Sequence, residues 1–228
     1  YNGFSHVYEY IGEHMISITG TFPNIYMNNN AADKLKIKKV LNLGTVGWTS
    51  LLGAFYGCAN LTEFTAGSTD TSAVTSMQSM FHDCIGLTSS DVSSLDTSLA
   101  TSMYAMFYNS SLSSIDVSSF NTSQVVNAQF VFRGHVTDQL TSIVGVEDWN
   151  ITGFNNTAGL SSFITGNGKM TTAQYDNLLI KWEAQASVIP AMTTAFGTSK
   201  YTGGGAAATA HTSLTDVYGW SIGDGGIA

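Results

Sequence analysis

The sequence predicts an α/β repeat fold: a right-handed solenoid in which short parallel strands alternate with short helices, with a cap at each end. The main observation is an internal repeat. Four segments of similar sequence begin with leucines that are 26, 25 and 28 residues apart, at Leu61, Leu87, Leu112 and Leu140. A single unit of this length cannot bury its own apolar face, so neighbouring units are expected to stack and share one continuous core.

Several columns of the repeat recur together. An apolar residue followed by Phe appears at Met80–Phe81, Met106–Phe107 and Val131–Phe132, with Ala54–Phe55 upstream. A polar residue followed by Thr-Ser appears at 70–72, 96–98 and 121–123. The expected organisation is therefore an N-terminal cap or linker over residues 1–50, a repeat region over 51–166 and an α/β capping domain over 167–228.

The N-terminal cap is predicted to be β-rich. HVYEYIG and HMISITG, in residues 6–20, alternate in the manner of strands, and Gly20, Pro23 and the Asn28–Asn30 run mark turns. Because the chain begins at Tyr1 without an initiator Met, we expect either that a preceding segment has been removed or that this is the ordered part of a longer protein.

The first half of each repeat is predicted to be a strand. Leu112, Ile115 and Val117 show the L-x-x-I-x-V spacing of a leucine-rich-repeat strand, with these side chains pointing inward. Residues between the inward positions then face outward on the sheet. These outward positions form the candidate ligand-contact strip, which comprises Glu63, Thr65, Ser89, Asp91, Ser114, Asp116 and Ser142.

The second half of each repeat is predicted to be a short helix. In SAVTSMQSMF the apolar residues Val74, Met77, Met80 and Phe81 fall at i, i+3, i+6 and i+7, which is one helical face. A preceding Ser or Thr can cap the free N–H groups of such a helix. The Met and Phe columns are interpreted as core packing, with the phenylalanines in one interior row formed by Phe55, Phe81, Phe107 and Phe132.

The repeat columns resemble the BspA-like bacterial surface-protein repeat, a relative of the leucine-rich repeats. LSSIDVSSFNTSQV and DTSAVTSMQSMFHDC carry the resemblance, which covers about residues 50–166 and weakens in the fourth copy at Trp149 and Phe154. The segment from about residue 170 to 228 also resembles segments that close repeat proteins of bacterial surfaces and of phage tails or fibres. The resemblance implies a surface-exposed adhesin or host-contact protein without enzymatic activity.

The C-terminal cap is predicted to begin with a helix at Thr171 or Thr172, whose inward residues are Tyr175, Leu178, Leu179 and Trp182. A strand is expected near residues 187–189. The Gly203–Gly205 turn leads into a second helix over AAATAHTSLTDVYG, and a final strand is expected at residues 220–222.

Two columns of aligned Asp or Asn side chains are candidate chemical groups. Asp91 and Asp116 share a repeat column, and adjacent strands lie about 4.8 Å apart, so mutual repulsion is expected to raise one of their pKa values. Paired acids of this kind serve glycoside hydrolysis, which leaves a glycan-cleaving enzyme as an alternative. Asp70, Asp96 and Asn121 form a second column, which is assigned to turn structure, with calcium binding as a lesser alternative.

Cys58 and Cys84 occupy equivalent positions in neighbouring repeats. Buried free thiols are favoured, although a disulfide is conceivable at that spacing. The sequence contains no metal-ligand spacing and no cofactor motif, so no metal or cofactor is expected.

Composition limits the range of partners. Charged residues make up only 11% of the chain and the formal net charge is −8, which argues against binding to nucleic acid. No apolar run is long enough to insert into a membrane. We expect an extracellular recognition module on a virion tail or fibre or on a bacterial surface, with a host glycan or protein as partner. The alternative is a structural spacer or decoration protein that contacts neighbouring subunits, including further copies in a homotrimer.

Overall fold

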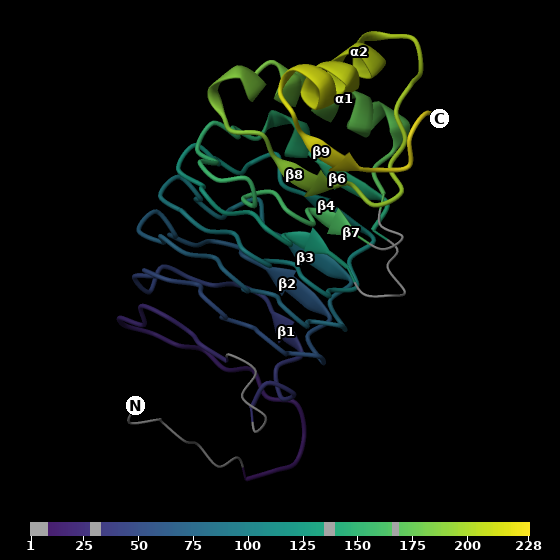
Figure 1. Cartoon of the computed structure of the whole chain (residues 1–228). Coiled ribbons are helices and arrows are strands. Elements are labelled where there is room, and N and C mark those ends of the chain that lie inside the picture. Colours follow the sequence, from purple (N-terminus) through teal and green to yellow (C-terminus); the bar gives the residue numbers. More distant parts are fainter. Residues whose placement is uncertain (1–8, 28–32, 135–139, 166–168) are drawn as a thin grey trace.

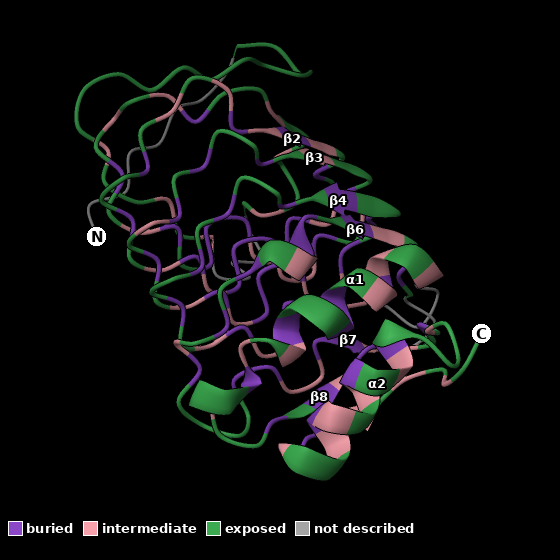
Figure 2. Ribbon diagram, turned by 90° about the horizontal axis from the view of Figure 1, so that it is seen from above, coloured by how far each residue is buried: buried purple, intermediate pink, exposed green. Residues whose placement is uncertain are grey.

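The computed structural model describes residues 9–27, 33–134, 140–165 and 169–228. The chain runs through a stack of coils, from the N-terminal end at the bottom of Figure 1 to two helices at the opposite end. Successive coils pair in parallel with the residues about one repeat further along the chain. Buried residues recur in coil after coil, so the core is a column that follows the stack (Figure 2).

The first halves of the repeats form short parallel strands, as predicted. β1 (Lys39–Val40), β2 (Glu63–Thr65) and β3 (Ser89–Asp91) make one sheet, while β4 (Ser114–Asp116) and β6 (Ser142–Val144) make another. The central residue of most strands points into the core, and Phe64, Ile115 and Ile143 are buried. Their neighbours within each strand point outward, which follows from the two-residue period of a β-strand.

The second halves of the repeats are not helices, so that prediction is wrong. Residues 77–84 instead form overlapping turns, in which the N–H groups of Met80, His82 and Cys84 donate to the carbonyl three residues earlier. A helix is prevented because left-handed residues recur in each coil. One column of positive φ angles comprises Gly53, Ser79, Ala105, Phe130 and Ser162, and a second, four residues later in three of these coils, comprises Gly57, Asp83 and Asn109.

Hydrogen bonds between coils replace the missing helical bonds. The N–H groups of Met77, Ser79, Phe81 and Asp83 donate at 2.8–3.0 Å to carbonyls of the next coil. Further along the stack the same column of turns contains the paired strands β5 (Phe132–Arg133) and β7 (Ile164–Thr165). The stack therefore has a second hydrogen-bonded ladder on the side opposite the strands β1 to β4, and its buried residues include Met80, Phe81 and the equivalent pair Met106 and Phe107.

The predicted row of phenylalanines is confirmed. Consecutive rings in the row Phe55, Phe81, Phe107 and Phe132 have centroids 5.7, 5.4 and 5.8 Å apart, with interplanar angles of 13°, 14° and 4°. All four side chains are buried. The near-parallel rings give the core a continuous aromatic column with one ring in each coil.

Buried threonines join the coils at the Thr-Ser positions. The Thr97 hydroxyl donates to the Asn121 carbonyl at 3.0 Å and accepts from the Asn121 N–H at 2.8 Å. Thr71 makes the same pair of bonds to Asp96 in the next coil, and Thr122 donates to the Asn150 carbonyl. Each hydroxyl therefore pairs with backbone groups of the following coil in partly buried hydrogen bonds.

The N-terminal segment departs from the predicted β-rich cap. Residues 13–20, which include the HMISITG segment, form no strand, and residues 9–12 form bends. Large apolar side chains in this segment remain exposed, among them Tyr10, Ile11, Met15 and Ile16. Alternation alone was misleading here: Glu13 reaches the following coil through a side-chain ion pair with Lys38, and among the described residues the backbone bonds to that coil begin at Phe22.

The C-terminal end is closed by helices. α1 (Thr172–Glu183) begins at the predicted cap, where Thr171 and Gln174 form a capping box. Its predicted inward residues Tyr175, Leu178, Leu179 and Trp182 are all buried. A second helical segment consists of α2 (Ala206–Thr212) and the π-helical turn η3 (Ser213–Val217), which agrees with the prediction for this region.

The remaining elements fill the spaces around α1. The strand expected near 187–189 is instead the 3₁₀ turn η2 (Ala186–Val188), and the strand β8 (Thr193–Ala195) follows it. β8 pairs in parallel with β9 (Ser221–Gly223), close to the expected final strand. A further 3₁₀ turn, η1 (Val146–Asp148), lies against α1. Tyr175 on α1 donates to Asp224 at 2.6 Å and so ties the chain end to this helix.

Candidate functional site

The structure places the predicted contact strip on the strands in two groups. Glu63 and Thr65 of β2 lie directly beside Ser89 and Asp91 of β3. Ser114 of β4 lies beside Ser142 of β6, while Asp116 lies beside Val144. All seven predicted residues are at least partly exposed. They form a shallow polar surface rather than an enclosed cleft.

Both ends of the strip contact neighbouring elements. Lys39 on β1 forms an ion pair with Glu63 at 2.8 Å, and Gln174 on α1 donates to the Ser142 hydroxyl at 3.0 Å. The middle of the strip, around Ser89 and Ser114, keeps exposed hydroxyl groups. A ligand that follows the stack would therefore meet serine hydroxyl groups at the centre, beside the exposed carboxylates of Asp91 and Asp116.

The carboxylates of the strip are engaged in local turns. Asp91 accepts hydrogen bonds from the hydroxyl and the N–H of Ser93 at 2.7 and 3.1 Å, and Asp116 accepts from the N–H of Ser118 at 2.9 Å. The Ser93 hydroxyl and then its N–H lower the pKa of Asp91. The expected rise in the pKa of Asp91 or Asp116 is therefore not found at Asp91, because hydrogen bonding to its ionised form outweighs the opposing effect of burial.

The second carboxylate column has the structural role that the sequence indicates. Asp96 accepts from the N–H of Ser98 at 2.9 Å, and Asn121 accepts from that of Ser123 at 3.0 Å. Asp70 binds both the hydroxyl and the N–H of Ser72, which lower the pKa of Asp70. These Asx turns hold the corner that precedes each buried threonine.

Acid is expected to weaken the fold through these turns. Because the folded-state pKa values of Asp70, Asp91 and Asp96 lie below their unfolded values, their stabilising effect is present above about pH 4 and is lost as the pH falls through the folded values. Chemical unfolding measured between about pH 5 and about pH 2 should show this decline. The Asp91→Asn variant, which keeps an acceptor oxygen, should decline less. An equal decline in both proteins would contradict the role assigned to Asp91.

The cysteines are buried and unpaired, as favoured from the sequence. The Cys84 thiol contacts the Phe55 carbonyl at 3.1 Å. Burial raises the pKa of the Cys58 thiol to about 12 and also raises that of Cys84. Both groups remain protonated at neutral pH, which is typical of packing residues and not of nucleophiles.

A partly exposed aromatic row was missed in the sequence. Tyr56, His82 and Tyr108 directly follow the buried phenylalanines, and their rings stack at 4.3 and 4.4 Å along the coils. Burial lowers the pKa of His82, while nearby Asp83 opposes that effect. Arg133 occupies the same column in the next coil. The signal was present in the alignment, since each of these residues comes one position after the Phe column.

Other chemical groups do not assemble into a recognisable centre. Within the described ranges, no three His, Cys, Asp or Glu side chains gather as they would around a metal ion. None of the described helices has the length and apolarity to cross a bilayer. An open groove of about 180 Å³ lies near the N-terminal end between Asn24, Tyr26, Ser50 and Leu52. None of these lining residues belongs to the strip or to the aromatic row.

Comparison with known proteins adds one finding. A family model described as "Mycoplasma protein of unknown function, DUF285" matches residues 21–165, which is more than half of the chain. The match includes the strands β1 to β7 and ends before α1. No curated protein and no solved structure matches the chain.

Proposed function

Since the chain belongs to the DUF285 family, whose function is unknown, we propose that it is a surface recognition module of the BspA-like type. In this proposal the stacked coils are a capped solenoid of the leucine-rich-repeat type, displayed outside the cell or on a virion. The side chains that project from the coils bind a host-surface glycan or protein. The family match covers the repeat coils, in which the resemblance to BspA-like surface repeats lies.

The observation that carries this proposal is the repeated outward polar column on the strands. Ser89 and Ser114 are exposed, while Phe64 and Ile115 on the same strands are buried. Coil after coil thus presents neutral hydroxyl groups on a rigid scaffold. Rigid presentation lowers the entropic cost of binding, which suits recognition of an extended partner.

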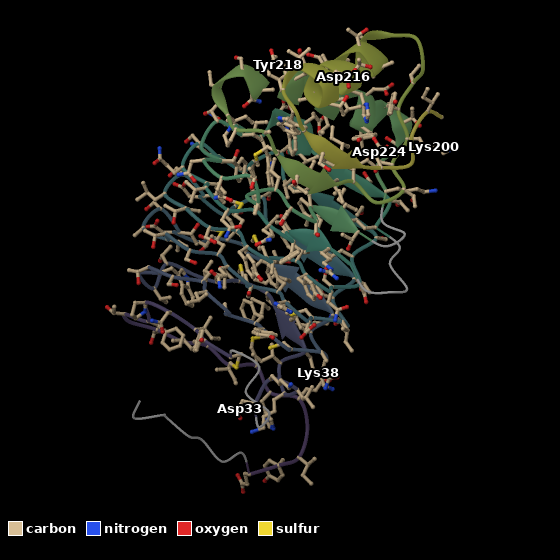
Figure 3. All side chains as sticks on the ribbon, in the orientation of Figure 1. Asp33, Lys38, Lys200, Asp216, Tyr218 and Asp224 are labelled. Atoms are coloured by element: carbon tan, nitrogen blue, oxygen red, sulfur yellow. The ribbon has the colours of Figure 1, made fainter. Side chains whose placement is uncertain are left out.

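A structural role in an assembly is the second candidate function. It is favoured by the exposed apolar residues of the N-terminal segment, where Tyr10 is 73% and Met15 is 84% exposed. Side chains of this kind are typical of surfaces that contact another molecule. Figure 3 shows that Asp33 and Lys38, at the same end, lie far from Asp216 and Asp224 at the helical end. The two ends of the stack thus offer different chemistry to neighbouring subunits.

The proposal is tested by binding of the purified chain to candidate host cells and to a glycan array. Ser114→Arg places a long cation in the centre of the strip and is expected to lower binding, whereas Thr101→Arg, at an exposed position outside the strip, is the matched control. Equal binding by both variants would exclude the strip as the contact surface. An absence of binding to all cells and glycans, together with electron micrographs that place the chain inside its native particle, would favour the structural role.

A further inference from the structure

Arg133 is the only arginine in the chain, and it lies in an unusual environment. Its guanidinium carbon is 5.5 Å from the centroid of the Tyr108 ring and 5.3 Å from that of Phe130. Within the part of the chain that the structure describes, no carboxylate lies within ion-pair distance of this group. The side chain is only partly buried, and the protein has a formal net charge of −8.

Phe130 is the second unusual feature. Its φ angle is +62°, and the equivalent positions in the other coils carry small residues, namely Gly53, Ser79, Ala105 and Ser162. A left-handed backbone costs a side-chain-bearing residue about 1–2 kcal/mol, and a bulky residue is rare there. Phe130 does not offset that cost in the core, because its side chain is only partly buried. Its ring contacts Tyr104, Tyr108 and Arg133 instead.

The described residues around this pair are rich in hydrogen-bonding groups. The Asn109 amide donates to Asp83 at 2.7 Å, so this carboxylate beside the aromatic row is engaged. Gln129, beside Phe130, donates to the Ser161 hydroxyl of the next coil. Tyr104 is partly exposed next to Phe130. We refer to Tyr104, Tyr108, Phe130 and Arg133 as the arginine–aromatic patch.

We propose that the arginine–aromatic patch is a binding site for a carboxylated glycan, meaning a polysaccharide with uronic or sialic acid units. Two aromatic rings hold the guanidinium through cation–π contacts, so its planar fork of N–H groups is oriented before binding. That fork matches a carboxylate with two parallel hydrogen bonds. The neighbouring amide and phenol groups suit a hydroxyl-rich ligand.

This inference goes beyond the proposed function, because the patch lies on the ladder opposite the strand strip. Phe64 from the strand side meets Phe55 and Phe81 from the other side inside the core, so the two outer surfaces are separated by the core. Variants on one surface can therefore be tested without altering the other.

The test measures binding of the full chain to a uronic acid polymer and to a sialylated polymer, each beside a counterpart whose carboxyl groups have been reduced to alcohols. The unaltered protein is expected to bind at least one carboxylated polymer and neither reduced form. Arg133→Gln should weaken binding at least about tenfold, and Arg133→Lys should weaken it also, because an ammonium group lacks the bidentate geometry. Phe130→Ser restores the residue found in two other coils and should weaken binding without loss of thermal stability.

The Ser114→Arg variant of the strand strip is the control, and it should bind the carboxylated polymers as the unaltered protein does. If Ser114→Arg loses cell binding but still binds the carboxylated polymers, the patch is supported as the polymer site and the strip is a separate contact surface. The proposal is overturned if neither carboxylated polymer binds, if the reduced polymers bind equally well, or if Arg133→Gln, still folded by thermal melting, binds unchanged.

Discussion

Replacement of Phe81 by alanine is expected to lower the free energy of unfolding by about 3–5 kcal/mol, the range found for removal of a large buried aromatic side chain. The Phe81 ring is fully buried and stacks between Phe55 and Phe107 in the adjoining coils. It also makes an edge contact with Phe64 at 4.7 Å, which joins the two ladders across the core. The substitution therefore leaves a cavity at the meeting point of three coils.

The measurement is denaturant unfolding followed by circular dichroism. Ile85→Ala serves as the matched control, because Ile85 is four residues away and 49% exposed. That control is expected to change the free energy of unfolding by less than about 1 kcal/mol. A loss below about 1 kcal/mol for Phe81→Ala would contradict the aromatic column as the basis of the core.

Replacement of Thr97 by valine is expected to cost about 1–3 kcal/mol. Valine keeps the shape of threonine but leaves both the N–H and the carbonyl of Asn121 without the Thr97 hydroxyl. Both bonds are partly buried, and a hydrogen bond of this kind contributes about 0.5–1.5 kcal/mol. The hydroxyl columns would thus stabilise the stack through hydrogen bonds between coils, in addition to apolar burial.

Two further variants isolate this effect. Thr97→Ser keeps the hydroxyl and loses only one methyl group, so it should cost about 1 kcal/mol. Thr101→Val removes an exposed hydroxyl that donates to the Thr75 carbonyl at 3.2 Å, and water can replace that bond. If Thr97→Ser is as destabilising as Thr97→Val, the threonine contribution comes from packing and not from the hydroxyl.

The column arrangement could be predicted because it depends on residues that repeat at a fixed spacing. Phe55, Phe81 and Phe107 must occupy equivalent positions if the coils are equivalent, and burial then brings them together. The helix α1 could be predicted as well, since Thr171 and Gln174 form a local capping signal and its apolar face is regular. The residues that determine the phenylalanine column and the helix α1 thus lie within the segment itself or at equivalent positions of the repeat.

The turns in the second half of each repeat could not be predicted from one repeat alone. Met77, Met80 and Phe81 fit a helical face, but they are also buried in a series of turns with a left-handed residue at Ser79. The choice is made by the neighbouring coils, which supply the hydrogen-bond acceptors that a helix would supply internally. A local pattern contains no information about those partners.

Of the two candidate sites, one could be predicted from the sequence and the other could not. The outward strip followed directly from strand alternation, so Ser89, Ser114 and their neighbours were placed correctly on the surface. The arginine–aromatic patch was missed because the helical interpretation concerned the inward Met and Phe columns and gave no role to the residues after each Phe. Phe130 also departs from its column, and its significance depends on a backbone angle that the sequence does not reveal.

The in-register stacking of the coils is the claim on which the strip, the aromatic column and the patch all depend. It is tested most directly by engineered cysteines at Glu63 and Ser89, which lie opposite each other on β2 and β3. Paired parallel strands place such residues about 4.8 Å apart, within the range that a disulfide can span. The diagonal pair at Glu63 and Asp91 should lie about 8 Å apart and serves as the control.

Under mild oxidation, the Glu63→Cys/Ser89→Cys protein is expected to form an internal disulfide in nearly every folded molecule, as measured by mass spectrometry after alkylation of free thiols. The Glu63→Cys/Asp91→Cys protein should remain reduced. Efficient bridging of the diagonal pair, or a lack of bridging in the direct pair, would contradict the in-register stack.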